Sequence, residues 1–450
     1  NINLFGNESV AVTETFAIPT LNRGYSVFTV TAKAGAPANL LFTNSSQGTG
    51  FAAAQNNSTG PTGVSVLFRG TNLGQAAGNG VATISDTGPT NGFLFNGQGG
   101  ANGTSTKGIL PWALVDATVT GSGTSFATGD GTTFTSAILR PLAAGEYGTA
   151  NAFAVNTNVL LNSGTTTVAA GVNPNSITID SSAGLTIGSL QQVSLSSGGI
   201  LVRSGSTSTI AGGVINQTSG FSPLNIWTLG NLTIGSTFNG GNGTSNAAVG
   251  FVKAGDGTLT LSTPTSGIAG LTAMGVNTMS GQTVINGGTL KLNGGTNTLA
   301  ANNYLEVGLG GSLDLNGTSQ YVFGLFTDGA VAGAGGTITS SAGTGNLVVN
   351  QDNTGRNWAG TISGSVNFTR SGQSTLTVYS PQTYTGATLL NAGTTTLRDA
   401  AKISGTSSID LNYATLTLDN NVGTTDLADR VNDAAPIALR GATFNFTGRA

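Results

Sequence analysis

The sequence contains neither cysteine nor histidine among its 450 residues. Without cysteine, the chain can form no disulfide bonds and no thiolate metal sites. The absence of both residues also removes Ser-His-Asp and Cys-His catalysis and the commonest zinc ligands. An enzyme built from this chain would have to use paired carboxylates, or a carboxylate with Arg or Lys, as a polysaccharide-cleaving β-helix would.

Charged residues are also scarce, at 7 % of the chain with a formal net charge of −3, against about 25 % in a typical soluble domain. The lysines and arginines form no cluster, so nucleic acid and anionic membrane surfaces are poor candidates as partners. No apolar run approaches the roughly 18 to 20 residues needed to cross a bilayer. We therefore expect no membrane span in this segment.

Glycine is abundant, with 71 residues, and 38 % of the chain is hydrophobic. Short apolar runs alternate with Gly, Asn and Ser turns, as in "KAGDGTLTLS" at 253–262. Side chains of a strand point alternately to its two faces, so Leu259 and Leu261 share one face and Thr258 and Thr260 share the other. This pattern predicts many short, half-buried strands whose outer face is uncharged.

Related motifs recur at 250–292 and 357–397, with a partial copy at 158–168. Their unequal spacing argues against a propeller of equal blades and favours a solenoid, from which loops of any length can leave the stack. We predict an all-β, right-handed parallel β-solenoid of many short coils with irregular loop insertions. It would form one continuous unit over 1–450, and an array of β-sandwiches is the alternative.

Stacked coils bury their apolar face inside and pair each backbone with the coils above and below. Charge would be scarce because equal neighbours lie only about 4.8 Å apart along the stack. At an assumed ~20 residues per coil, the chain would build a rod on the order of 100 Å long. The best helical pattern, "TDLADRVNDAA" at 425–435, predicts a short solvated helix on the outside.

The two longer motifs resemble the autotransporter-associated β-strand repeat. Its pattern is a Trp-x-Gly-x-Ile-x-Gly lead-in, a Lys/Arg-x-Gly-x-Gly-Thr-Leu-Thr-Leu strand, then Tyr-Thr-Gly-x-Thr and Gly-Thr-Leu. The second copy matches at these positions: Trp358, Gly360, Ile362, Gly364, Arg370, Gly372, Leu376, Tyr384, Gly386, Thr388 and Gly393. The first copy matches at these positions: Lys253, Gly255, Gly257, Leu259, Gly281, Thr283, Gly288 and Leu290.

The match has departures: Ser374 replaces a glycine, Thr395 replaces a leucine, and the first copy lacks the tyrosine and carries an insertion. In that family the repeats form β-solenoid passengers or stalks exported to the bacterial surface. The resemblance implies the same for this chain. The chain begins without a leader pattern and stops within a strand pattern, so we expect a piece of a longer array.

No residues stand out as catalytic, cofactor-binding or metal-binding. The acids are scattered, and Asp180, Asp314, Asp410 and Asp419 at strand ends are interpreted as turn caps. Thr-x-Thr pairs are too sparse for the flat ladder that an ice-binding surface needs. The tryptophans Trp112, Trp227 and Trp358 could be carbohydrate platforms, but packing is the favoured interpretation.

We therefore expect an extracellular structural protein, not an enzyme, that needs no cofactor and forms part of a fibre on the bacterial outer surface. Its partners would be copies of itself or adjoining repeat units, joined end to end. The alternative is an adhesin that binds surface glycans through the irregular loops at 44–62, 96–107 or 267–279. A polysaccharide-degrading β-helix enzyme is a third hypothesis.

Overall fold

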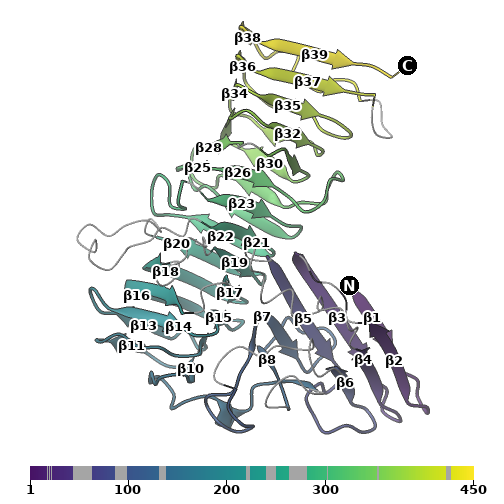
Figure 1. The fold of residues 1–450 in the computed structure, drawn as a ribbon, viewed down its shortest axis with the longest axis vertical. Coiled ribbons are helices and arrows are strands. Elements are labelled where there is room, and N and C mark those ends of the chain that lie inside the picture. Colours follow the sequence, from purple (N-terminus) through teal and green to yellow (C-terminus); the bar gives the residue numbers. More distant parts are fainter. Residues whose placement is uncertain are drawn as a thin grey trace. The chain divides into compact units, whose positions relative to one another are not determined.

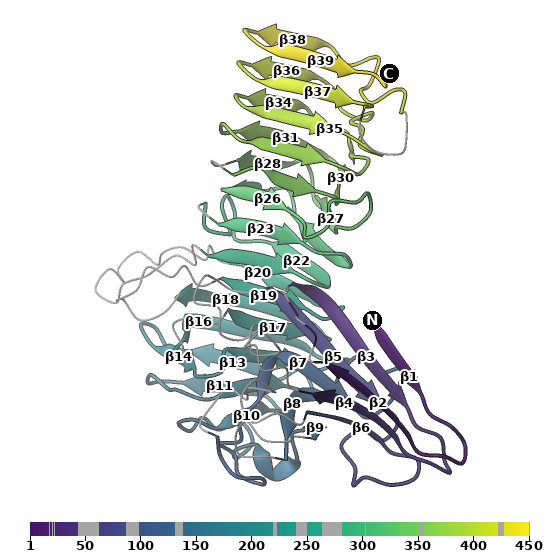
Figure 2. The same ribbon diagram turned by 45° about the vertical axis from the view of Figure 1, so that its right-hand side comes forward.

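The computed structural model describes residues 1–17, 19, 21, 23–43, 63–86, 99–130, 138–218, 223–239, 250–262, 281–301, 303–351, 354–421 and 427–449. This part of the chain is almost entirely β-structure, with parallel strands in stacked sheets (Figures 1 and 2). The predicted all-β solenoid class is thereby confirmed. The chain divides into two compact units, Asn1–Gly257 and Thr258–Ala450.

The first unit opens with a stack of two parallel sheets. One sheet has the order β1 (Ile2–Phe5), β3 (Gly24–Thr31), β5 (Val64–Gly70) and β7 (Leu110–Asp116); the other has β2 (Val12–Ala17), β4 (Ala38–Thr43) and β6 (Ala82–Asp86). Phe28 lies in register with Phe68, and their rings stack with centroids 5.2 Å apart. Aromatic and aliphatic columns between the two sheets form the core of this stack.

Antiparallel pairing closes this stack, which the purely parallel prediction did not include. Strand β7 pairs antiparallel with β8 (Ser125–Gly129), and β8 pairs antiparallel with β9 (Leu139–Pro141). The 3₁₀ helix η1 (Ala144–Glu146) follows β9. Side chains alternate between the two faces of a strand whether it pairs parallel or antiparallel, so the apolar pattern of the sequence could not reveal this reversal.

A second parallel stack completes the unit. Its first sheet has β10 (Asn158–Leu161), β12 (Ser176–Ile179), β15 (Gly199–Val202), β17 (Leu224–Thr228) and β19 (Phe251–Ala254); its second has β11 (Thr165–Val168), β13 (Gly184–Ile187), β16 (Thr207–Gln217) and β18 (Asn231–Asn239), with β14 (Gln192–Leu195) also on β16. Ile177, Ile200 and Ile226 occupy one inward column of the first sheet. All three are buried.

The outer face of this stack is apolar as well. Leu201, Trp227 and Ala254 pack in one cluster with Leu67 and Leu114 of the first stack. The indole N–H of Trp227 donates to the Pro111 carbonyl at 2.9 Å. Strand β17 is therefore buried at every position, whereas buried and exposed residues would alternate along a half-buried strand.

The second unit is a stack whose coils pass through several parallel sheets. One sheet contains β21 (Gln282–Ile285), β23 (Tyr304–Val307) and β26 (Gly324–Phe326), and a second contains β20 (Thr258–Leu261), β22 (Gly288–Leu292), β24 (Gly311–Asp314), β27 (Thr337–Thr339), β30 (Thr361–Gly364) and β33 (Thr383–Tyr384). A third sheet contains β25 (Ser319–Val322), β28 (Gly345–Asn350), β31 (Val366–Ser371), β34 (Thr388–Asn391), β36 (Ile409–Asn412) and β38 (Ile437–Arg440). The fourth contains β29 (Arg356–Trp358), β32 (Thr375–Val378), β35 (Thr394–Leu397), β37 (Thr415–Asp419) and β39 (Thr443–Thr447).

Register pairs give the length of each coil directly. Phe368 pairs with Thr388, and Thr388 pairs with Ile409, so these coils are close to the assumed 20 residues. Ile409 pairs with Ile437, which shows a longer coil where the chain makes an excursion. Inward columns such as Leu376, Thr395 and Leu416 run from coil to coil.

The helix predicted at 425–435 is not formed in its described part, residues 427–435. Arg430 from this stretch is only 2 % exposed, and Val431 makes a parallel bridge to Ile403. The segment runs as part of a coil because its backbone pairs with the neighbouring coil: the Ile403 N–H donates to the Arg430 carbonyl at 2.7 Å. In the described part of the chain, no helix is long and apolar enough to cross a membrane.

Two predicted binding loops, 44–62 and 267–279, lie outside the described residues, as do 96–98 of the third. The single continuous solenoid predicted for 1–450 stays a prediction.

We predict that replacing an inward side chain destabilises the second unit much more than replacing its outward neighbour. Leu376→Ala should lower the free energy of unfolding by about 2–5 kcal/mol, because Leu376 is fully buried. Thr377→Ala, on the outer face of the same strand, should change it by less than about 0.5 kcal/mol. Urea unfolding of the whole chain checks both, and equal effects would contradict the assigned faces.

Candidate functional site

The two copies of the repeat place their basic residue at a corner between two strands. Lys253 lies in β19 and Gly255 follows it before β20; Arg370 lies in β31 and Gly372 follows it before β32. Gly255 and Gly372 have φ angles of +80° and +91°. A Cβ atom at Gly372 would lie 1.8 Å from the carbonyl oxygen of Gln351. Only glycine fits this corner, in conformation and in space.

The other repeat positions have structural environments too. Leu259, Leu376, Trp358 and Tyr384 are buried. Gly288 and Gly393 have positive φ angles. Backbone from the neighbouring coil lies against Gly360 and Gly386, and Gly281 is buried immediately before β21. The predicted repeat residues therefore form the core and the corners of the stack, and they do not converge on one surface site.

The basic residues of the motif point inward. Lys253 is 0 % exposed, and its ammonium donates to the carbonyl oxygens of Gly255 and Gly257 at 2.5 and 2.7 Å. Burial lowers the pKa of Lys253 to about 7. The guanidinium of Arg370, also 0 % exposed, donates to the Ala392 carbonyl in the next coil, and burial lowers its pKa to about 10.

Arg430 is a third buried cation that donates to a backbone carbonyl, although the sequence pattern predicts it on a solvated helix. Its guanidinium donates to the Ala401 carbonyl at 2.6 Å and to the Asn420 side-chain oxygen at 2.9 Å. Burial lowers the pKa of Arg430. Each of these cations satisfies carbonyl groups that a turn leaves without a strand partner. Charged residues are rare in this chain, and that rarity is the one feature of the sequence that could have indicated a structural role for Arg430.

A chain of polar side chains crosses the core between the second copy's strands. The Trp358 indole N–H donates to the Gln382 side-chain oxygen at 3.2 Å, and the Gln382 amide donates to the Gly360 carbonyl at 2.9 Å. The hydroxyls of Tyr384 and Thr388 lie 2.6 Å apart. Trp112, Trp227 and Trp358 are all buried, so the packing interpretation of the tryptophans is confirmed and the platform interpretation is wrong.

The departure at Thr395 also has a structural consequence. Thr395 points inward between Leu376 and Leu416, and it borders a small cavity lined mostly by apolar side chains. Its buried hydroxyl has no hydrogen-bond partner. A leucine, as the family pattern has it, would fill more of this space.

Threonine pairs prove less sparse in space than in sequence. Thr375 and Thr377 lie in register with Thr394 and Thr396, and these in register with another pair, Thr415 and Thr417. The outer face of β32, β35 and β37 is therefore a continuous hydroxyl ladder over three coils. On these three strands the pairs are close enough for a ladder, because the stretch of chain between one pair and the next is about one coil long.

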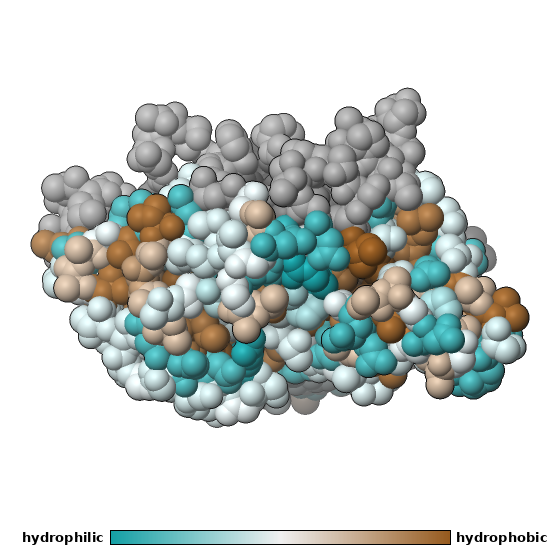
Figure 3. Space-filling view, turned by 90° about the horizontal axis from the view of Figure 1, so that it is seen from below, coloured by the Kyte–Doolittle hydropathy of each residue, from teal (hydrophilic) through white to brown (hydrophobic). Residues whose placement is uncertain are grey.

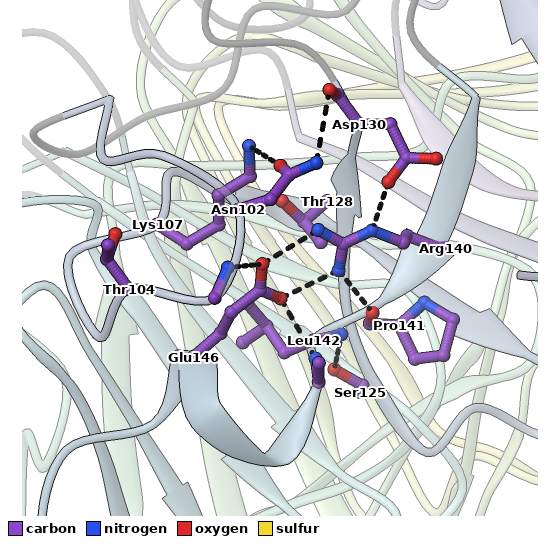
Figure 4. Close-up of polar contacts among 12 residues, drawn as sticks. Asn102, Thr104, Lys107, Ser125, Thr128, Asp130, Arg140, Pro141, Leu142 and Glu146 are labelled. Atoms are coloured by element: carbon purple, nitrogen blue, oxygen red, sulfur yellow. Dashed lines mark hydrogen bonds and ion pairs between the residues drawn. The ribbon is translucent and has the colours of Figure 1, made fainter.

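A cluster of charged side chains lies in the first unit, where β8, β9, η1 and the loop before β7 meet (Figure 4). Glu146 is fully buried, and its carboxylate accepts from both terminal nitrogens of Arg140 at 2.7 Å. The backbone N–H groups of Gly103 and Ala143 also donate to it, at 3.0 and 2.9 Å. The Arg140 Nε donates to Asp130 at 2.5 Å.

Burial and hydrogen bonds in this cluster shift the pKa values of Glu146 and Lys107. Burial alone would raise the pKa of Glu146, but the hydrogen bonds from Arg140, Gly103 and Ala143 outweigh it and hold that pKa at about 2. Burial lowers the pKa of Lys107, whose ammonium donates to Asn102 at 2.8 Å. The Glu146 carboxylate already accepts four hydrogen bonds, so it is poorly suited to act as a general acid or base.

The acids expected to cap turns mostly do so. Asp180, Asp314 and Asp419 accept hydrogen bonds from backbone N–H groups one or two residues further on, at 2.7, 2.8 and 2.9 Å. Asp410 differs, because its carboxylate accepts from Arg440 in the next coil of the stack. Within the described ranges, no group of three or more potential metal-ligating side chains lies together.

Comparison with protein-family models, with curated proteins and with solved structures found no match for this chain. The geometry of the site residues is that of buried side chains whose hydrogen bonds hold neighbouring segments of the chain together.

We predict that Glu146→Gln destabilises the first unit by about 3–5 kcal/mol, because it leaves the Arg140 guanidinium buried without its main counter-charge. Asp130→Asn is the matched control: the Asp130 side chain is 52 % exposed, so its loss should matter by less than about 1 kcal/mol. In the parent protein, the contribution of Glu146 should be lost as the pH falls from about 4.5 towards 2. Thermal unfolding between pH 2 and 7 measures this, and an acid limb unchanged in Glu146→Gln would contradict it.

We also predict an alkaline gain in stability from Lys253. Its folded-state pKa of about 7 lies below the ordinary lysine value of 10.5, so the unfolded chain binds the proton more tightly. Stability should then rise with pH above 7, by up to about 1.4 kcal/mol per pH unit. Lys107 acts in the same direction, so Lys253→Met should flatten the slope rather than abolish it. Urea unfolding between pH 7 and 9.5 measures both slopes.

Proposed function

We propose that this chain is a structural segment of an extracellular fibre on the bacterial outer surface, built by stacking of β-solenoid coils. The observation that carries the proposal is the register of its strands: each coil repeats the inward and outward columns of the one before. A further coil presenting the same columns can then stack on the last one. Length and rigidity would be the function, without any reaction.

Side-chain ladders on the outer face support unlimited stacking. The Asn367 amide donates to Asn346 at 2.9 Å, and Asn346 donates to Ser319 at 2.9 Å. The Asn412 amide donates to Asn391 in the same way, at 2.9 Å. An amide is both donor and acceptor, so it can pair with a copy of itself, which a charged side chain cannot do.

The last described coil supports the proposal from its inward columns. Ile437 and Leu439 of β38 lie in register with the buried Ile409 and Leu411, yet they are 44 % and 54 % exposed. Phe446 of β39 is 68 % exposed. A β-solenoid coil stacked on β38 and β39 would bury these side chains.

Protection from proteases would suit an exposed fibre. The chain has 15 lysines and arginines, and Lys107, Lys253, Arg370 and Arg430 among them are no more than 2 % exposed. The resemblance of the two motifs to the autotransporter-associated β-strand repeat supports the same location. On the one face drawn in Figure 3, hydrophobic residues are interspersed with hydrophilic ones.

Electron microscopy of native material purified from the cell surface tests the proposal. We expect long filaments with an axial repeat on the order of 100 Å, or a few times that, as coils about 4.8 Å apart require. Discrete compact particles without end-to-end contacts would contradict the fibre proposal. In that event, an adhesin that binds through loops would be the next hypothesis to examine.

A further inference from the structure

Tyr413 departs from two local rules at once. It forms the corner between β36 and β37 with a φ angle of +49°, a left-handed conformation that is costly for a bulky side chain. Its side chain is 80 % exposed, which makes it the most exposed large hydrophobic residue in the described part of the chain. Neither backbone preference nor burial accounts for a tyrosine here.

Equivalent corners show what the stack itself requires. Ala392, one coil earlier, has φ of +62°, and Gly441, one coil later, has φ of +59°. The backbone N–H groups of Ala392 and Tyr413 both donate to the next coil, to the carbonyls of Asn412 and Arg440 at 2.9 and 2.8 Å. The corner therefore forms with a small side chain or with none, and the Tyr413 ring is additional to it.

The neighbouring coil makes room for this ring. A Cβ atom at Gly441 would lie 2.8 Å from the Cε1 atom of Tyr413, so the ring rests against bare backbone on one side. High exposure of the side chain leaves much of the remaining ring surface open to solvent. The Tyr413 ring, which packs against backbone on one face and is open to solvent elsewhere, is a flat apolar surface with a hydroxyl at its edge.

Planar polar groups line the outer face of β34, β36 and β38, and one of them, Asn412, directly precedes Tyr413 in the chain. The Arg440 guanidinium donates to both oxygens of Asp410 and, at 2.9 Å, to the side-chain oxygen of Asn412. Asn412 in turn donates to Asn391. The side chains of Arg440 and Asp410 are 59 % and 31 % exposed. This row offers hydrogen-bond donors and acceptors to hydroxyl groups without a net charge.

From this geometry we propose that Tyr413 and the row formed by Asn391, Asp410, Asn412 and Arg440 are a glycan-binding site. One face of a pyranose ring is made of C–H groups and would stack on the Tyr413 ring, while its hydroxyl groups would bond the polar row. The site lies on a corner of the solenoid, and none of its residues belongs to the loops expected to bind glycans. It does not rest on the fibre proposal.

The test compares variants of the full chain for retention on immobilised cellulose, chitin and alginate, with affinities taken from depletion isotherms. The parent protein should bind at least one of the three. Tyr413→Gly should weaken that binding about ten-fold or more, because it removes the central aromatic contact. Tyr413→Trp should keep it. Thermal unfolding of Tyr413→Gly should give a midpoint equal to or above that of the parent, because glycine relieves the strained corner.

Ala392→Gly is the matched control, since it relieves the same backbone conformation one coil away and removes no ring. It should match Tyr413→Gly in its stabilising direction and leave glycan binding unchanged. A lower unfolding midpoint for Tyr413→Gly would assign the ring to packing and overturn the proposal. It is also overturned if the parent binds none of the three polysaccharides, or if Tyr413→Gly binds as tightly as the parent.

Discussion

Parallel pairing in register is the constraint on which the rest of this structure depends. It places each side chain about 4.8 Å from its counterpart in the next coil, so a residue type is acceptable only if it tolerates a neighbour like itself. Leucine and isoleucine meet this condition inside the stack. Threonine and asparagine meet it outside, where Asn391 and Asn412 share a hydrogen bond. Lysine and glutamate do not, which explains a chain with 7 % charged residues.

Several of the buried charges lie where this repetition is interrupted. Lys253, Arg370 and Arg430 donate to carbonyl groups at corners or excursions between strands. Glu146 and Arg140 join the antiparallel end of the first stack to η1. At Lys253, Arg430 and Glu146, several hydrogen bonds offset the cost of burying an ion. These buried charged residues thus hold neighbouring segments of the chain together.

Function on such a scaffold would have to come from its ends, its loops or its corners. Inward columns that reach the coil of β38 and β39 favour stacking on a further coil, and the strained Tyr413 favours recognition of a ligand. These roles are compatible, because the corner ring faces outward and the stacking columns face inward. A fibre that also binds glycans along its side would combine both.

The sequence by itself determined the fold class, the inward and outward faces of strands such as β20 and β32, and the glycine corners. Alternation and turn residues act locally, so they can be recognised without knowing what lies nearby. Only the tertiary structure decided that β7, β8 and β9 pair antiparallel, that the outer face of β17 is buried, and that 427–435 joins a coil. It also decided that Glu146 meets Arg140 and that three threonine pairs form one ladder. These features depend on which distant segments become neighbours, and coil lengths that vary along the chain hide that information from the sequence pattern.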